Sequence, residues 1–407
     1  MSIFVNRVLN LRDVQVIGFD MDHTLVRYNV LAFEKLAFDE AIRRLIRHRS
    51  YPDLIAGCPF EPQRVIRGLV VDKRRGNLLK LSLFGRGKAA SHGHRPMEFS
   101  LQKALYRDLF IDLTDTNFQA IDTCFSLAYA VLLGHLVRLK DEQPGLPFPT
   151  YEEIADDIQD AIDQAHRDNS LKGEVRRRLP EFIRRETGIV RALERMKRYG
   201  KRLIIITNSD YDYTRQLLDY AFNPLLEHCR DWTGLFEFVI TLAGKPRFFT
   251  DTLPFLRVDP ATGLMSNLSG RLLPGIYQGG SANRLQQELG LNGEEILYLG
   301  DHIYGDIVSL KKSCNWRTAL VIEELEGEIA ALRQGEPVMR EIVGRMHAKI
   351  ALETRLDELY TRRIEHSEEV QAEIGRTRRK IQQLDRALGE GLNRYRGYFH
   401  PAWGEIM

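Results

Sequence analysis

The stretch from Val16 to Leu25 constrains the fold of this chain most, because an apolar run in it ends abruptly in a carboxylate. The run stops at Asp20, and a second carboxylate, Asp22, follows two residues later. An apolar run before a polar turn is typical of a buried strand in a parallel sheet. Ligands of open α/β sheets bind beyond the carboxyl ends of such strands. We therefore expect Asp20 at the mouth of a sheet and Asp22 in the loop above it, although an ordinary Asp-rich turn has the same pattern.

Two later segments repeat this pattern of an apolar strand that ends in a polar residue. Residues 203–206 lead into Thr207, and residues 296–299 lead into Gly300 and Asp301. In a parallel sheet the ends of such strands lie on one edge. The other elements expected in this region are a helix over 189–199 before Gly200 and strands over 236–240 and 318–322.

Residues 41–184 interrupt this alternation and are predicted to form an inserted α+β cap. The expected elements before and within it are a helix over 31–47, two strands around a polar turn over 68–83, and helices over 118–140 and 150–166. Thr150 and Glu153 have the spacing of a capping box at the start of the last helix.

The sequence therefore predicts an α/β protein with three parts. The catalytic core would consist of residues 1–40 and 185–330, with the cap at 41–184 between them. Residues 331–407 form a helical C-terminal extension in this prediction, because apolar residues recur every three to four positions over 338–388, with a polar break at 366–369. This helical hairpin either packs on the core or forms a contact between copies in a homo-oligomer.

Composition excludes several classes of partner. The 407 residues carry a formal net charge of only +2, which gives no global attraction to nucleic acid or to an anionic membrane. Residues 1–10 lack the pattern of a signal peptide, and the longest apolar stretch, 125–137, is too short to cross a bilayer. Four scattered cysteines fit a reducing compartment. We expect a cytoplasmic protein whose partner is a small molecule, with no nucleic-acid polymer and no membrane.

Asp20 and Asp22 suit phosphoryl transfer or a divalent cation. Asp20 offers a carboxylate nucleophile, and its attack on phosphorus would give an aspartyl-phosphate. Asp22 is placed to protonate the leaving alkoxide and then to take a proton from the incoming water. A hydroxyl residue there would leave the acyl-phosphate longer-lived, so the second Asp favours a phosphatase.

Thr207, Asn208 and Ser209 can hold phosphate oxygens through hydroxyl, amide and backbone N–H groups. The helix that begins near Asp212 adds an N-terminus, which is itself an anion site. The same residues also fit an ordinary helix N-cap with no ligand.

Lys245 precedes a proline and lies close to two phenylalanines, in a loop that would hold its ammonium near a transferring phosphoryl group. An isolated lysine is more often a solvated surface charge, and Arg247 is a possible substitute for it. Asp301 ends a strand beside Asp20, so that both can share one Mg²⁺, and Asp306 can orient Lys245 or a metal-bound water. The segment with Asp301 and Asp306 also fits an ordinary Asp-Gly turn that binds no metal.

These segments resemble the four motifs of the haloacid-dehalogenase (HAD) superfamily and, more narrowly, the cytosolic purine 5′-nucleotidase family within it. The match runs from about residue 6 to residue 325. The matching segments are Gly18 to Leu25, Arg67-Gly68-Leu69-Val70, Gly76 to Lys80, Thr207 to Tyr211, Lys245 to Phe249 and Ile296 to Asp306.

The resemblance implies a Rossmann-like HAD core with a cap inserted after the first strand. It also implies Mg²⁺-dependent hydrolysis of nucleoside 5′-monophosphates, typically IMP and GMP. The implied metal ligands are Asp20, the backbone carbonyl of Asp22, and Asp301. The implied phosphate-binding residues are Thr207, Asn208 and Lys245, and the residues implied to face the nucleoside in the cap are Asp163, His166 and Lys172.

The chain departs from the eukaryotic members of that family at three positions. It has Gln159 in place of an Arg, Arg167 in place of an aromatic residue, and Ser126 in place of an Asn of the nucleotide-effector site. Two other functions stay open beside the 5′-nucleotidase. One is a phosphatase or phosphotransferase for another small phosphomonoester, and the other is a non-catalytic nucleotide-binding scaffold.

Overall fold

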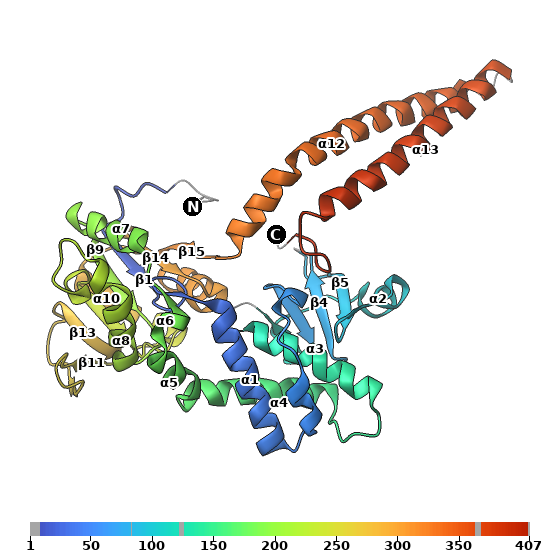
Figure 1. Ribbon diagram of the computed structural model, residues 1–407. Helices are drawn as coiled ribbons and strands as arrows, with labels where there is room; N and C mark the ends of the chain where they lie inside the picture. The colour runs from blue at the N-terminus through green and yellow to red at the C-terminus, as the bar shows by residue number, and fades with distance from the viewer. Residues whose placement is uncertain (1–8, 83, 122–125, 363–367, 406–407) are drawn as a thin grey trace. The chain divides into compact units, whose positions relative to one another are not determined.

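Strand β1 (Val16–Phe19) lies in an eight-stranded sheet between β9 (Arg202–Ile206) and β14 (Ile296–Gly300), and both neighbours run parallel to it (Figure 1). Every residue of β1 is buried, as expected for a parallel strand covered on both faces. The remaining strands are β10 (Phe238–Thr241), β13 (Gly275–Gly279) and β15 (Arg317–Leu320), which are parallel, and β11 (Phe255–Val258) and β12 (Met265–Asn267), which are antiparallel at one edge. This computed structural model confirms the mostly parallel α/β core that the sequence predicts.

Helices accompany the strands of this sheet. The helix expected over 189–199 is observed as α7, and Gly200 follows it in a left-handed conformation that suits glycine. Gly18 allows close packing inside the sheet, because a Cβ there would lie 2.9 Å from the ring of Tyr298. The helices of the core are α7 (Thr187–Arg198), α8 (Tyr211–Ala221), α9 (Arg247–Thr250), α10 (Ala282–Leu289) and α11 (Ser309–Cys314).

The cap contains a second sheet, which is antiparallel throughout its five strands. The hairpin expected over 68–83 is observed as β3 and β4, although residue 83 lies outside the described residues. The strand order is β6-β5-β4-β3-β7, with bounds β3 (Leu69–Asp72), β4 (Asn77–Leu81), β5 (Gly87–His92), β6 (Arg95–Pro96) and β7 (Phe118–Ala120).

Helices α1, α3 and α4 pack against one another (Figure 1). The predicted capping box at the start of α4 is confirmed, because the Thr150 hydroxyl accepts from the Glu153 amide while the Glu153 carboxylate accepts from the Thr150 amide. The helices here are α1 (Val30–Arg49), α2 (Phe99–Tyr106), α3 (Leu127–Glu142), α4 (Tyr151–Arg167), α5 (Ser170–Arg177) and α6 (Leu179–Phe182).

One predicted element is wrong in part. The helix expected over 118–140 begins only at Leu127, because residues 118–120 form β7 and pair with β3. An apolar segment this short has no clear period, so pairing with a neighbouring strand decides its conformation. Residues 122–125 of the predicted helix lie outside the described residues.

The structure describes residues 9–82, 84–121, 126–362 and 368–405, and these belong to two compact units within 4–322 and 323–407. The smaller unit contains the expected helical hairpin, in which α12 (Leu325–Arg362) packs along α13 (Glu368–Arg396). Buried side chains between the helices include Ile342, Leu388 and Tyr395. The domain boundaries given above remain predictions. Within the described ranges, no helix has the length and apolar character needed to cross a membrane.

Glu34 on α1 is fully buried and accepts a hydrogen bond from the backbone N–H of Ala128 at the start of α3, at 2.5 Å. Burial raises the pKa of this carboxyl to about 8, against the backbone hydrogen bonds, which lower it. The folded protein therefore holds a proton on Glu34 that the unfolded chain loses above about pH 4.5. Stability then falls as pH rises from about 4.5 to 8.

We expect Glu34→Gln to flatten this pH dependence. Because glutamine stays neutral, the free energy of unfolding of the variant should not fall with pH as that of the wild type does. Between pH 5.5 and pH 8, the difference between the two should shift in favour of the variant by up to about 3 kcal/mol. Urea denaturation at both pH values measures this. Asp39→Asn, on the exposed side of the same helix, is the matched control. Parallel pH profiles for wild type and Glu34→Gln would contradict the assignment.

Candidate active site

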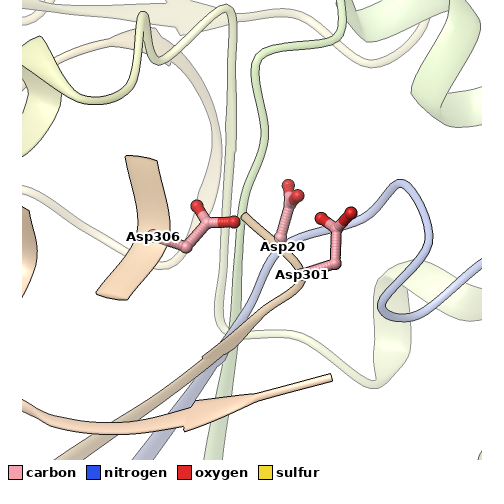
Figure 2. Close-up of side chains that lie close together, drawn as sticks. All are labelled: Asp20, Asp301 and Asp306. Carbon is pink, nitrogen blue, oxygen red and sulfur yellow. The ribbon is translucent and has the colours of Figure 1, made fainter. Parts of the chain in front are cut away.

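Three buried carboxylates meet at the carboxyl edge of the central sheet. Asp20 directly follows β1, Asp301 directly follows β14, and Asp306 lies in a π-helical turn (Ile303–Val308). One oxygen of each lies within 4.8 Å of the others. Figure 2 shows the three side chains entering the same space from separate chain segments. The strand-end prediction for Asp20 and Asp301 thus describes where the structure places them.

Gly300 explains how Asp306 reaches this cluster. A Cβ at position 300 would lie 2.4 Å from the Oδ2 atom of Asp306, so any larger residue would displace that carboxyl. The backbone N–H of His302 donates to the same oxygen at 3.2 Å. The missing side chain at Gly300 and this hydrogen bond therefore place the Asp306 carboxyl next to the end of β14.

Lys245 is the cation of the cluster. Its ammonium lies 2.7 Å from Asp20 Oδ1 and 2.7 Å from Asp306 Oδ1, and it donates to the Tyr298 hydroxyl at 3.0 Å. Its side chain is only 5% exposed, so it is not a solvated surface lysine. Arg247, the alternative considered from the sequence, pairs with Asp251 instead and is largely exposed.

The charges in this cluster do not balance. Burial raises the pKa of Asp20 well above its usual value; Lys245 opposes this, while Asp306, Asp22 and Asp301 add to it. Burial and then Asp306 raise the pKa of Asp301 to about 7. Burial alone would lower the pKa of Lys245, but Asp20, Tyr298 and Asp306 outweigh it and keep the ammonium charged. Of the three carboxylates, Asp20 and Asp306 thus lie within ion-pair distance of the one ammonium.

Asp22 lies beside the cluster, and its carboxyl faces other partners. The Tyr28 hydroxyl donates to Asp22 Oδ1 at 2.6 Å, and the Ser209 hydroxyl donates to Asp22 Oδ2 at 2.8 Å. The carboxylate cluster contains Asp306, whereas the metal set predicted above contained Asp22, through its carbonyl group.

The predicted phosphate-binding residues follow β9 at the same edge. Thr207 is buried, and its hydroxyl accepts from the Ser209 amide at 3.0 Å. The Asn208 side chain accepts from the Lys245 N–H at 2.7 Å and donates to the Lys245 carbonyl at 3.1 Å. In this structure Asn208 therefore fastens the loop that carries Lys245.

The cap brings two of its three predicted substrate residues to this edge. Lys172 on α5 donates to the Ser209 hydroxyl at 3.4 Å and lies 3.8 Å from the Asp210 carboxylate. Burial lowers the pKa of His166 on α4, and the charges of Asp163, Lys172 and Asp22 are all close enough to act on it. Asp163 itself accepts from the Gln159 side chain at 2.8 Å, so Gln159 orients Asp163.

Sequence reasoning assigned no role to Arg67, Tyr28 or Tyr298. Arg67, in the cap, is buried and donates to the Asp301 carbonyl at 2.5 Å. The Tyr298 hydroxyl donates to the Ile206 carbonyl at 2.9 Å beneath Lys245. The Arg67 segment was part of the family resemblance, which was the available signal for that residue. Tyr298 also lies in a segment of that resemblance, Ile296 to Asp306. No local pattern marks Tyr28, whose partner Tyr213 is 185 positions away in the sequence.

Comparisons with known proteins are consistent with this geometry. The chain is similar to a 5′-nucleotidase domain-containing protein from Dictyostelium discoideum, with 28% identity over 347 residues that cover 84% of this chain and 58% of that protein. It is also similar to 5′-nucleotidase domain-containing protein 2 from Homo sapiens, with 28% identity over 411 residues that cover 95% of this chain and 74% of that protein. The chain thus matches less than two thirds of the Dictyostelium relative.

A solved structure, described as a predicted phosphoglycolate phosphatase from Haemophilus somnus, matches with 14% identity and a TM-score of 0.29, covering 77% of this chain and 97% of that one. The model of the 5′ nucleotidase family matches residues 3–407, which is nearly the whole sequence. This chain belongs to the 5′ nucleotidase family.

Proposed function

We propose that this protein hydrolyses nucleoside 5′-monophosphates, such as IMP or GMP, with Mg²⁺ and through an aspartyl-phosphate on Asp20. The observation that carries the proposal is the buried pair of Asp20 and Lys245 at a parallel strand end, at 2.7 Å, with Asp22 beside it. A site that only binds a nucleotide has no need of a second carboxyl held next to the first.

The residues present fit a magnesium ion. Asp20, Asp301 and Asp306 offer only carboxylate oxygens, which are the donors Mg²⁺ prefers, and these lie within 4.8 Å of one another. The cluster holds more negative charge than Lys245 offsets, so a divalent cation would relieve its repulsion. When bound, Mg²⁺ polarises phosphoryl oxygens and neutralises part of their charge.

One oxygen of Asp20 is left for attack. Oδ1 accepts from the Met21 N–H at 2.8 Å and pairs with Lys245, whereas Oδ2 accepts no hydrogen bond from the described residues. Attack by Oδ2 forms a bond to phosphorus as the bond to the nucleoside 5′-oxygen breaks. Asp22 gives its proton to that oxygen. Lys245 stabilises the negative charge that spreads over the transferring group.

The second step restores the carboxylate. Water attacks the phosphorus of the aspartyl-phosphate and gives a proton to Asp22, and the bond between Asp20 and phosphorus breaks to release phosphate. Thr207 and Ser209 lie at the same edge to hold the phosphate oxygens. Lys172 and His166, which approach this edge from the cap, are placed to contact the nucleotide.

Phosphate release from a panel of nucleoside monophosphates and sugar phosphates tests this function. We expect purine nucleotides to react fastest in Mg²⁺ and the activity to vanish in EDTA. Equal rates on sugar phosphates would overturn the nucleotide assignment, and activity that survives EDTA would overturn the metal requirement.

A further inference from the structure

The carboxyl of Asp22 is held from both sides by hydroxyl groups. Tyr28 donates to one oxygen at 2.6 Å and Ser209 to the other at 2.8 Å. Each oxygen thus has a donor that comes from a different part of the chain, and the two contacts together fix the plane of the carboxyl group. A proton donor that must meet one particular oxygen of a substrate needs this kind of constraint.

Tyr28 is itself held firmly. Its side chain is buried, its ring stacks on His23 at 4.7 Å, and its hydroxyl lies 2.9 Å from that of Tyr213 on α8. Either hydroxyl can be the donor in this tyrosine pair, so Tyr28 can bond to Asp22 before and after the proton of Asp22 has moved.

The position of Tyr28 in the chain links Asp22 to the cap. Tyr28 lies in β2 (Arg27–Tyr28), before the predicted cap, and β2 pairs with β8 (Ile183–Arg184), at the end of the predicted cap. The ammonium of Lys172, from the cap, lies 4.8 Å from the ring centre of Tyr213. The pair of Tyr28 and Tyr213 therefore contacts both Asp22 and a residue of the cap.

We propose that the Tyr28 hydroxyl, backed by Tyr213, is a positioning group that aims the Asp22 carboxyl at the leaving oxygen of the substrate. This inference rests on the proposed phosphatase function. In this role Tyr28 neither contacts the substrate nor gives it a proton. Its effect must therefore appear only where the leaving group needs a proton.

The test compares two esters that differ in this need. The nucleoside of a 5′-monophosphate leaves as a basic alkoxide, which requires a proton donor. The leaving group of p-nitrophenyl phosphate is a stable phenolate, which does not. We expect Tyr28→Phe to lower kcat/KM for the nucleotide by about 10- to 100-fold, because it removes a hydrogen bond to the carboxylate that forms as Asp22 gives up its proton. For p-nitrophenyl phosphate the change should stay within about threefold. Since kcat/KM reports the steps through phosphoryl transfer, later hydrolysis of the aspartyl-phosphate does not enter.

Two variants complete the design. Asp22→Asn should show the same selective loss more strongly. Tyr277→Phe removes a buried hydroxyl that donates to the Leu273 carbonyl at 2.6 Å, in the core sheet but away from the site, and should change neither rate. An equal loss on both esters in Tyr28→Phe, or no loss on either, overturns the positioning role.

The outcome for the proposed function is read separately. A wild-type protein that releases phosphate from neither ester overturns that function, and the positioning role with it. If the selective loss appears in Asp22→Asn but not in Tyr28→Phe, the phosphatase mechanism stands and only the inference on Tyr28 fails.

Discussion

Replacing Asp20 by Asn is expected to lower phosphate release from a nucleoside monophosphate by about 10⁴-fold or more, because an amide cannot attack phosphorus as a carboxylate does. The change is nearly isosteric and leaves Lys245 its pairing with Asp306 at 2.7 Å, so the fold should persist. Initial rates at saturating nucleotide and Mg²⁺ measure the loss, with thermal unfolding to verify the fold.

Asp39→Asn is the matched control for this experiment, since Asp39 is an exposed acid on α1 that pairs with Lys35. Its rate should equal that of the wild type. An Asp20→Asn variant that is folded and retains a rate within about tenfold of the wild type would show that another group is the nucleophile.

Lys245→Met should have the second largest effect and should act on both rate and stability. Without the ammonium, the transferring phosphoryl group loses a fixed positive charge, and we expect kcat to fall by roughly 10³-fold. The same change leaves Asp20 and Asp306 buried without their cation, which typically costs about 3–5 kcal/mol.

The pH dependence of that cost has a defined sign. Lys245 lowers the pKa of Asp301, which burial and Asp306 nevertheless raise to about 7, so its removal raises the pKa further. A carboxyl whose pKa is higher in the folded protein holds more protons there than in the unfolded chain. Stability of Lys245→Met should therefore decrease, relative to the wild type, as pH rises above about 7.

Urea denaturation in EDTA at several pH values measures this difference. Lys35→Met, which removes an exposed lysine from α1, should leave both the rate and the pH profile unchanged. If Lys245→Met keeps the wild-type profile, the ammonium does not balance the carboxylates of the cluster.

The positions of Asp20 and Asp301 could be predicted from the sequence because local patterns carry them. An apolar strand that ends at an acid places that acid on the carboxyl edge of a parallel sheet, whichever strands become its neighbours. The capping box of Thr150 and Glu153 was predictable for the same reason, since its hydrogen bonds are local.

Contacts between distant segments could not be predicted in this way. The hydroxyls of Tyr28 and Tyr213 meet across 185 positions in the sequence, and Arg67 reaches the Asp301 carbonyl across 234. The placement of Asp306 in the carboxylate cluster depends on a π-helical turn and on the absence of a side chain at Gly300. The sequence predicts helix where β7 forms, because pairing with β3, rather than local composition, decides the conformation of this segment.

If the substrate's phosphoryl group passes through Asp20, mass spectrometry of the quenched enzyme should find it on that residue. Asp22→Asn, which should slow hydrolysis of the intermediate, is mixed with Mg²⁺ and p-nitrophenyl phosphate, whose leaving group needs no proton from Asp22, and is then quenched in acid and digested. We expect one phosphoryl group, labile to hydroxylamine, on the peptide that contains Asp20, and none when Asp20 is also replaced by Asn. A phosphoryl group on another residue, or nucleotide turnover by the wild type without any phosphorylated enzyme, would contradict it.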